Sequence, residues 1–305
     1  MKLATLRTSF GTCAIRIDGP NVGTELDYED VGELLASPDW RKAAQLSGEP
    51  VVFDNADLAP VLPNPGKIIC VGVNYAKHAR EMGRELPTQP TLFIKFPDAL
   101  TGPFDDVYIP DYATKKLDYE GELAVVMGRR AHRVSVKDAL GYVAGYAIMN
   151  DYTLRDYQRA TTQFHAGKSF YRTAGFGPWL TTADEWAPGK AARLTTTVDA
   201  TYAKMTTLMI SSSPWPSSSH SVPPSTLSIL AMSLPPAPRK AWALRAARGR
   251  CLATAPAPAS ASKVLGQLRT PHASASHPLL VAAATTALVT AVNIQPYSGS
   301  SANTL

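Results

Sequence analysis

Acidic side chains are missing from the last third of this 305-residue sequence. All 25 aspartate and glutamate residues lie at or before Asp199, and the 106 residues from Ala200 to Leu305 contain none. The first part therefore carries 22 − 25 = −3 charges and the second carries 8 − 0 = +8. Soluble domains are about a quarter charged, so this stretch indicates two compositions in one chain. The overall charge of +5 comes from the tail and does not indicate that the first part binds nucleic acid.

Cysteines and long apolar runs are also scarce. The three cysteines, Cys13, Cys70 and Cys251, are scattered and form no CxxC pair, so the sequence suggests neither a disulfide framework nor a zinc site. The first residues contain no apolar run of the kind found in secretory signals. The longest apolar stretch, Pro278–Val292, is shorter than the about 20 residues of a transmembrane helix. We therefore expect a soluble, cytoplasmic protein.

Residues 1–65 are predicted to form a small N-terminal α+β domain. Leu3–Arg7 and Cys13–Ile17 have the composition of short strands. Residues 30–46 carry apolar side chains at helical spacing, interrupted by one proline, which predicts two helical segments. Three prolines within Leu58–Pro65 predict a linker to the next domain.

Residues 66–199 are predicted to form a mixed, β-rich catalytic domain, which makes the expected fold class α+β. The expected strands are Ile68–Val73, Thr91–Phe96, Leu117–Met127 and Val143–Met149, and the expected helices are Tyr75–Met82 and Val136–Tyr142, the latter capped by Ser135. After residue 200 the sequence becomes low in complexity, because Ala, Pro, Ser and Thr make up 60 of the last 106 residues. Such a composition does not predict a packed core.

Three carboxylates follow or precede apolar strands in the predicted catalytic domain. Glu120 and Glu122 are two residues apart, so on a strand they point to the same face. They directly precede the apolar run Leu123–Met127, and Asp151 follows another apolar strand. Like charges beside a core are costly unless a cation neutralises them. Oxygen ligands alone suit a hard ion such as Mg²⁺, Mn²⁺ or Ca²⁺; a solvated strand edge is the alternative interpretation.

Other polar residues could complete a catalytic site. His78 and Glu81 are spaced i, i+3, so on a helix the carboxylate could orient the imidazole as a general base. Arg155 lies one helical turn beyond Asp151 and could bind a substrate carboxylate. Lys168 could place positive charge where an oxyanion develops. An ordinary surface position is the alternative interpretation for each of these residues.

These candidates fall within motifs that resemble those of the fumarylacetoacetate hydrolase family. The motifs are Asn74-Tyr75-x-x-His78-x-x-Glu81, Tyr119-Glu120-Gly121-Glu122-Leu123, Asn150-Asp151-Tyr152-Thr153-x-Arg155-Asp156-x-Gln158 and Gly167-Lys168-Ser169-Phe170. They come in the family's order and at compatible spacing over about residues 60–195. The resemblance implies a mixed β-roll, usually found in homodimers.

The resemblance also implies a role for each candidate residue. By this resemblance the metal ligands for Mg²⁺ or Mn²⁺, or alternatively Ca²⁺, would be Glu120, Glu122 and Asp151. The residues implied to activate water are His78 and Glu81, and Lys168 would hold the developing oxyanion. The residues implied to contact the substrate are Tyr75, Arg155 and Gln158.

The activity implied by the resemblance is metal-dependent hydrolysis of a C–C bond. The substrate would be a β-diketo or acylpyruvate-type 2-oxo acid, in the breakdown of aromatic or related carboxylic acids. His78 would deprotonate water, and cleavage would leave an enolate beside the metal and Lys168. Oxaloacetate decarboxylation and isomerisation of 2-hydroxy-hepta-2,4-diene-1,7-dioate use the same enolate chemistry and stay open. We expect a small-molecule substrate and no nucleic-acid or membrane partner.

The resemblance ends abruptly near residue 200. The family continues with a strand-rich half that contains Gly-Asp-Val-Ile-Ala-Thr-Gly-Thr-Pro, which this sequence lacks. The missing motif can be recovered from residues 230–243 in a shifted frame. When each new codon takes the last base of one residue's codon and the first two bases of the next, compatible codons encode that motif followed by Lys-Gly-Val-Gly. We therefore predict that residues 200–305 are an out-of-frame tail, caused by the net loss of one nucleotide near codon 200. The alternative to an enzyme is then an inactive frameshifted product, insoluble or degraded because its β-roll cannot close.

Overall fold

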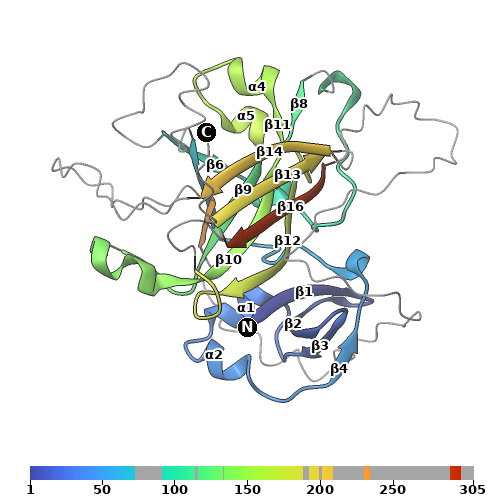
Figure 1. Cartoon of the computed structure of the whole chain (residues 1–305), viewed down its shortest axis with the longest axis vertical. Helices are drawn as coiled ribbons and strands as arrows, with labels where there is room; N and C mark the ends of the chain where they lie inside the picture. The colour runs from blue at the N-terminus through green and yellow to red at the C-terminus, as the bar shows by residue number, and fades with distance from the viewer. Residues whose placement is uncertain are drawn as a thin grey trace, which may run out of the picture.

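The computed structural model describes residues 1–72, 91–113, 116–132, 134–187 and 192–198, together with three strands at 201–208, 230–233 and 289–296 (Figure 1). The predicted helix Tyr75–Met82 lies outside these residues, as do the candidate residues Tyr75, His78 and Glu81.

The N-terminal part is an antiparallel meander with two short helices. Its strands pair in chain order: β1 (Lys2–Thr8), β2 (Gly11–Gly19), β3 (Val22–Glu25) and β4 (Pro50–Val52). The β1–β2 turn places Gly11 at φ 135°, which side chains other than glycine rarely adopt. The two predicted helical segments are α1 (Val31–Ala36) and α2 (Trp40–Ala43), and the short 3₁₀ helix η1 (Asn55–Asp57) follows β4. The predicted strands and helices of this part are therefore confirmed.

Asp30 begins helix α1 and offers a test of this part of the fold. Its side chain accepts a hydrogen bond of 2.8 Å from the backbone N–H of Glu33, and burial raises the pKa of its carboxyl. Because the folded-state pKa is raised, this carboxyl favours folding at low pH, and that contribution is lost as the pH rises through the folded-state pKa. We expect Asp30→Ala to lower the free energy of unfolding by about 1 kcal/mol.

Asp30→Asn is the matched control, because the amide oxygen can accept the same hydrogen bond without a buried charge. At neutral pH this variant should be at least as stable as the parent chain, and its advantage should shrink below about pH 4. Urea unfolding at the two pH values measures both effects. Equal destabilisation by alanine and asparagine would mean that the cap does not stabilise α1.

One large mixed sheet runs through the N-terminal part and the rest of the described chain. Its order is β4-β3-β2-β1-β12-β10-β9-β15-β5-β6, with β7 paired to β12. In Figure 1 the N-terminal strands lie at the bottom and the chain continues upward through β12 and β10. The strands not yet given are β5 (Lys67–Gly72), β6 (Thr91–Lys95), β7 (Leu100–Thr101), β9 (Gly121–Met127), β10 (Val143–Asp151), β12 (Ala174–Thr182) and β15 (Leu230–Ser233).

Smaller elements lie beside this sheet. Strands β8 (Leu117–Asp118) and β11 (Thr153–Leu154) form a two-stranded ladder, and β13 (Ala192–Val198) lies between β14 (Thr201–Leu208) and β16 (Val289–Pro296). Helices α4 (Arg155–Arg159) and α5 (His165–Lys168) lie above the sheet in Figure 1. The remaining 3₁₀ helices are η2 (Pro97–Ala99), η3 (Asp111–Ala113) and η4 (Val136–Tyr142). Within the described ranges, no helix has the length and apolar character needed to span a membrane.

The centre of the large sheet is buried on both faces. Eight of the nine residues of β10 and of β12 are buried, and strands covered on both faces read as nearly continuous apolar runs. Phe176, Met149 and Leu123 have no more than 2% of their surface exposed. The polar residues at the end of β10 therefore enter a region that is largely removed from water.

The structure confirms a mixed, sheet-rich α+β fold and changes several details of the prediction. The strand expected over Leu117–Met127 is divided into β8 and β9 at residues 119 and 120. Segment Val136–Tyr142 is a 3₁₀ helix, and the Ser135 hydroxyl donates to the Asp138 carboxylate at 2.5 Å, so it forms no side-chain hydrogen bond to the backbone.

The predicted linker Leu58–Pro65 packs into the protein. Leu58, Val61 and Leu62 have at most 1% of their surface exposed, and apolar side chains in a linker contribute to stability when buried. In addition, β1 pairs with β12 through Lys2↔Thr181 and Leu3↔Leu180. The division into domains at residues 65 and 199 stays a prediction, since the first boundary lies within one hydrogen-bonded sheet.

The cysteines differ in state. Cys13 is disulfide-bonded, although the sequence suggested no disulfide framework. Cys70 on β5 is a buried free thiol. Burial, with the negative charge of Asp151 beside it, raises the pKa of this thiol, so it stays protonated at neutral pH and is a poor nucleophile.

Candidate active site

The pairing of β9 with β10 brings the predicted carboxylates to one face of the sheet. Glu122 lies opposite Met149, and Gly121 lies opposite Asn150. The backbone N–H of Asp151 donates to the carbonyl oxygen of Glu120 at 2.8 Å, which places Glu120 opposite Asp151. Because alternate residues share a face, Glu120, Glu122 and Asp151 all face the same way.

Asp151 is the most deeply buried of these carboxylates. Only 5% of its side chain is exposed, and its two oxygens lie 2.9 Å from Lys95 Nζ and 2.8 Å from Lys168 Nζ. Burial alone would raise the pKa of Asp151, but the two positive charges outweigh burial and hold this pKa below its ordinary value. Asp151 is therefore ionised at neutral pH.

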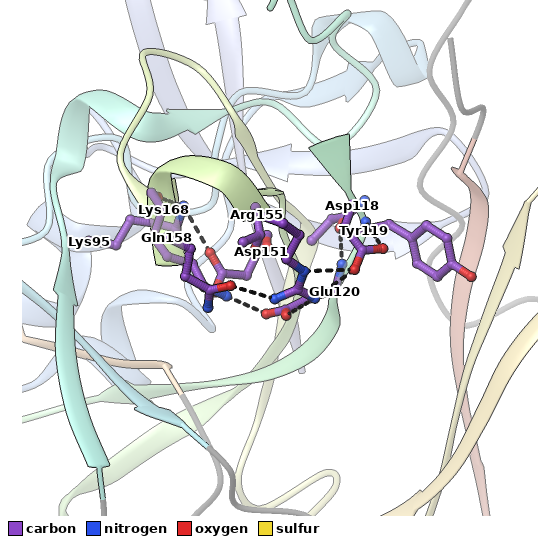
Figure 2. Close-up of polar contacts among 10 residues, drawn as sticks. Lys95, Asp118, Tyr119, Glu120, Asp151, Arg155, Gln158 and Lys168 are labelled. Atoms are coloured by element: carbon purple, nitrogen blue, oxygen red, sulfur yellow. Dashed lines mark hydrogen bonds and ion pairs between the residues drawn. The ribbon is translucent and has the colours of Figure 1, made fainter. Parts of the chain in front are cut away.

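Lys168 joins two of the carboxylates (Figure 2). Its ammonium group donates to Glu120 Oε2 and, at 2.8 Å, to Asp151 Oδ2. The ammonium also lies 5.2 Å from the centre of the Phe93 ring. Burial would lower the pKa of Lys168, but the charges of Asp151 and Glu120 raise it overall. Lys168 is thus a permanent cation, and only 3% of its side chain is exposed.

Arg155 contacts the same cluster from the first turn of α4. Its guanidinium donates to Glu120 at 2.5 Å and to Asp118 at 2.8 Å, and its Nη1 donates to Gln158 Oε1 at 2.9 Å (Figure 2). Charge-assisted hydrogen bonds of this kind fix both partners. The structure therefore shows Arg155 orienting the carboxylates and Gln158; its predicted contact with a substrate is a separate expectation.

Glu122 lies at the edge of this cluster. Its negative charge, like that of Asp151, raises the pKa of the Cys70 thiol, whereas the charges of Lys95 and Lys168 lower it. Glu122 has a further interaction of its own. Among the site residues that the structure describes, Asp118, Glu120, Glu122 and Asp151 against Lys95, Arg155 and Lys168 give 3 − 4 = −1, a small excess of negative charge.

Lys95 is a site residue that was not predicted from the sequence. Its side chain is fully buried and forms an ion pair with Asp151. The signal was present in the sequence, because Thr91, Phe93 and Lys95 share one face of a strand whose other face carries Leu92 and Ile94. A charged residue at an inward position of a strand indicates a buried partner, but alternation alone does not say which face points inward.

The structure brings together most of the predicted site. Glu120, Asp151, Arg155, Gln158 and Lys168 form one connected network, and Glu122 lies beside it. Over the ranges that the structure describes, no three acidic, histidine or cysteine side chains are grouped as in a preformed metal site. The lysine ammonium groups, instead, neutralise the carboxylates.

Comparison with known proteins places this network in a recognised sequence region. Residues 67–215 match the family model described as "Fumarylacetoacetate (FAA) hydrolase C-terminal". The chain is 49% identical over 125 residues to the oxaloacetate tautomerase YisK of Bacillus subtilis, covering 40% of this chain and 41% of the relative. It is 44% identical over 159 residues to a fumarylacetoacetate hydrolase domain-containing protein 2 homolog of Dictyostelium discoideum, covering 50% and 51%.

Other relatives and solved structures carry related names. The human mitochondrial oxaloacetate tautomerase FAHD2A is 39% identical over 132 residues, covering 43% of this chain and 41% of that protein. A fumarylacetoacetate hydrolase of Exiguobacterium antarcticum superposes with a TM-score of 0.55 at 28% identity, covering 68% of this chain and 75% of that structure. A 2-hydroxyhepta-2,4-diene-1,7-dioate isomerase of Mycobacterium marinum gives 0.53 at 26% identity, covering 69% and 77%.

The sequence matches end well short of the full relatives. The chain spans about two fifths to one half of the length of the curated relatives it matches. The structural matches extend further, to about three quarters of each solved chain. The similarity therefore supports the fold and the site region more strongly than any complete activity.

Proposed function

Because residues 67–215 make this chain a member of the fumarylacetoacetate hydrolase family, we propose that its site catalyses enolisation of a 2-oxo acid, with keto–enol tautomerisation of oxaloacetate as the first reaction. The observation that carries the proposal is the buried Lys168 ammonium between Glu120 and Asp151. This arrangement places the fixed positive charge of Lys168 beside two carboxylates that are proposed to bind a metal ion as well. The names of the tautomerase relatives support the choice among enolate reactions.

Three carboxylates on one face of the sheet, Glu120, Glu122 and Asp151, are the proposed ligands of a divalent metal ion. Lys168 contacts Glu120 and Asp151, and Lys95 Nζ lies 2.9 Å from Asp151 Oδ1, so an ion would bind beside two ammonium groups. Glu120, Glu122 and Asp151 offer only oxygen ligands, as Mg²⁺ and Mn²⁺ prefer. An ion bound there would polarise the carbonyl oxygen of a 2-oxo acid.

The residues of the chain supply the remaining requirements of enolisation. Negative charge develops on the substrate's carbonyl oxygen when a proton leaves the adjacent carbon, and the fixed Lys168 ammonium is placed to stabilise that charge. Arg155 holds Glu120 in position, and Phe93 and the surrounding strands limit access of water to Lys168. The general base is proposed to be His78 with Glu81.

The three enolate reactions are separated by their products. Tautomerisation returns oxaloacetate in its keto form, decarboxylation releases pyruvate and carbon dioxide, and hydrolysis of an acylpyruvate releases two acids. We expect the chain with Mn²⁺ or Mg²⁺ to accelerate loss of the oxaloacetate enol's ultraviolet absorbance by about 100-fold or more over the metal alone. Chelation of the metal should abolish this effect. Rates no higher than those of the free metal in all three reactions, with oxaloacetate and with an acylpyruvate, would end the proposal.

A second candidate of another class is the inactive frameshifted product. It is favoured by the absence of acidic residues after Asp199 and by the end of the family match at residue 215. An activity that appears only when the reading frame after codon 200 is restored would support this candidate for the chain as printed. Homodimer formation and a cytoplasmic location stay predictions; the human relative is named as mitochondrial.

A further inference from the structure

We propose that Lys95 is a positioning residue of this site, which holds the Asp151 carboxylate and the Lys168 backbone in their working arrangement. The inference rests on the proposed function, because it concerns the same site. Lys95 acts through its two neighbours and is not proposed to touch the substrate.

The burial of Lys95 requires a role for its charge. None of its side chain is exposed, and it is among the largest fully buried side chains of the described residues. An ammonium group removed from water costs several kcal/mol unless it is paired and hydrogen-bonded. A buried lysine that served only to fill space would be more stable as an apolar residue. Its charge therefore compensates something specific.

The contacts of Lys95 join three separate segments. The ammonium lies 2.9 Å from Asp151 Oδ1, at the end of β10, and donates to the carbonyl oxygen of Lys168, at the end of α5. Lys95 itself ends β6. Lys168 and Asp151 bind each other through their side chains, so Lys95 closes a triangle of contacts that fixes both.

The two lysines together hold both oxygens of Asp151. Asp151 Oδ2 accepts a hydrogen bond from Lys168, and Asp151 Oδ1 lies 2.9 Å from Lys95 Nζ in an ion pair. Lys95 thus fixes the orientation of a carboxylate that is proposed as a metal ligand, and partners of this outer kind orient metal ligands in proteins.

The neighbouring residue on the same face of β6 has a related effect. Phe93 shares that face with Lys95, and its ring lies 5.2 Å from Lys168 Nζ. The ring also meets Phe164 edge-on at 5.8 Å. Strand β6 therefore contacts Lys168 twice: Lys95 binds its backbone carbonyl oxygen, and Phe93 packs near its ammonium group. The inward-facing lysine at the end of this strand is thus placed to hold Lys168.

The test compares Lys95→Met with Lys95→Gln in the full chain, purified from the soluble fraction. Binding of Mn²⁺ without substrate is measured by calorimetry, and kcat and KM are measured with oxaloacetate. We expect Lys95→Met to weaken Mn²⁺ binding by about 10–100-fold and to lower kcat by a similar factor, with KM changed by less than about threefold. Lys95→Gln, which keeps a hydrogen-bond donor, should recover part of both losses. Lys67→Met, at an exposed position on β5, is the matched control and should match the parent chain.

Three outcomes decide the matter. A folded Lys95→Met or Lys95→Gln variant with parental Mn²⁺ affinity and kcat would overturn the positioning role. If Lys95→Met fails to fold, the Lys95→Gln variant supplies the decisive comparison. If the parent chain binds Mn²⁺ but turns over no 2-oxo acid, the proposed function fails, while the Mn²⁺ affinities still support or overturn the role of Lys95.

Discussion

Adding one nucleotide near codon 200 should raise the soluble yield of this protein by about tenfold or more, and should raise both its melting temperature and the increase in melting temperature that Mn²⁺ causes. We propose that the printed sequence after this point is read out of frame. In the restored frame, codons compatible with residues 230–243 encode Gly-Asp-Val-Ile-Ala-Thr-Gly-Thr-Pro-Lys-Gly-Val-Gly. Acidic residues then return to a part of the chain that has none.

The position of β15 gives this proposal a physical reason. Strand β15 lies between β9 and β5, parallel to the first and antiparallel to the second, so it connects the strand of Glu122 with the strand of Cys70. It has four residues, whereas β9 has seven and β5 has six. The sequence continues with Pro235 and Pro236, which lack the N–H that a central strand must donate. In the restored frame, residues 230–233 correspond to Gly-Asp-Val-Ile, and the motif continues without adjacent prolines.

The matched control is the insertion of three nucleotides at the same place, which adds one residue and keeps the printed frame. That variant should behave like the printed chain in yield and in melting. The prediction fails if the printed chain already has the soluble yield and the melting temperature of the chain with the restored frame. Resequencing of the coding DNA across codons 190–275 shows independently whether the additional base is present.

The local elements of this protein could be predicted because their signals are local. Strands β5 and β6 end within one residue of the predicted Ile68–Val73 and Thr91–Phe96, since period-two alternation and flanking turn residues mark them. Strand β12 was missed because Gly175, Gly177 and Pro178 interrupt its pattern. The structure explains why position 177 is a glycine, since a Cβ atom there would lie 2.9 Å from the side chain of Pro103.

The candidate site was predictable in its members and less so in its connections. The carboxylates could be found because Glu120 and Glu122 share a strand face and precede buried residues. The contacts of Lys95 could not, because they join β6 to segments more than fifty residues away, and no periodicity reports such pairs. The contact of Arg155 with a substrate stays a prediction; the structure adds that its guanidinium binds Glu120, Asp118 and Gln158, contacts that no periodicity indicates.

Replacing Glu120 with glutamine should abolish the activity while leaving the protein folded. Glu120 receives Lys168 on one oxygen and Arg155 on the other, so the variant removes the charge that aligns both cations. We expect kcat/KM to fall by about 10³-fold and Mn²⁺ binding to weaken by at least about 100-fold. The free energy of unfolding should fall by only about 1–3 kcal/mol, because Lys168 keeps Asp151 as a partner and Arg155 keeps Asp118.

Glu185→Gln is the matched control for the loss of one carboxylate. Glu185 forms an ion pair of 2.6 Å with the N-terminal ammonium and has 40% of its side chain exposed. Exposed pairs of this kind contribute about 0–1 kcal/mol, and Glu185 lies outside the site, so both activity and Mn²⁺ affinity should be unchanged. Full activity in Glu120→Gln would remove the active site proposed here. A parallel loss in both variants would mean that total charge, rather than the position of Glu120 between two cations, controls the reaction.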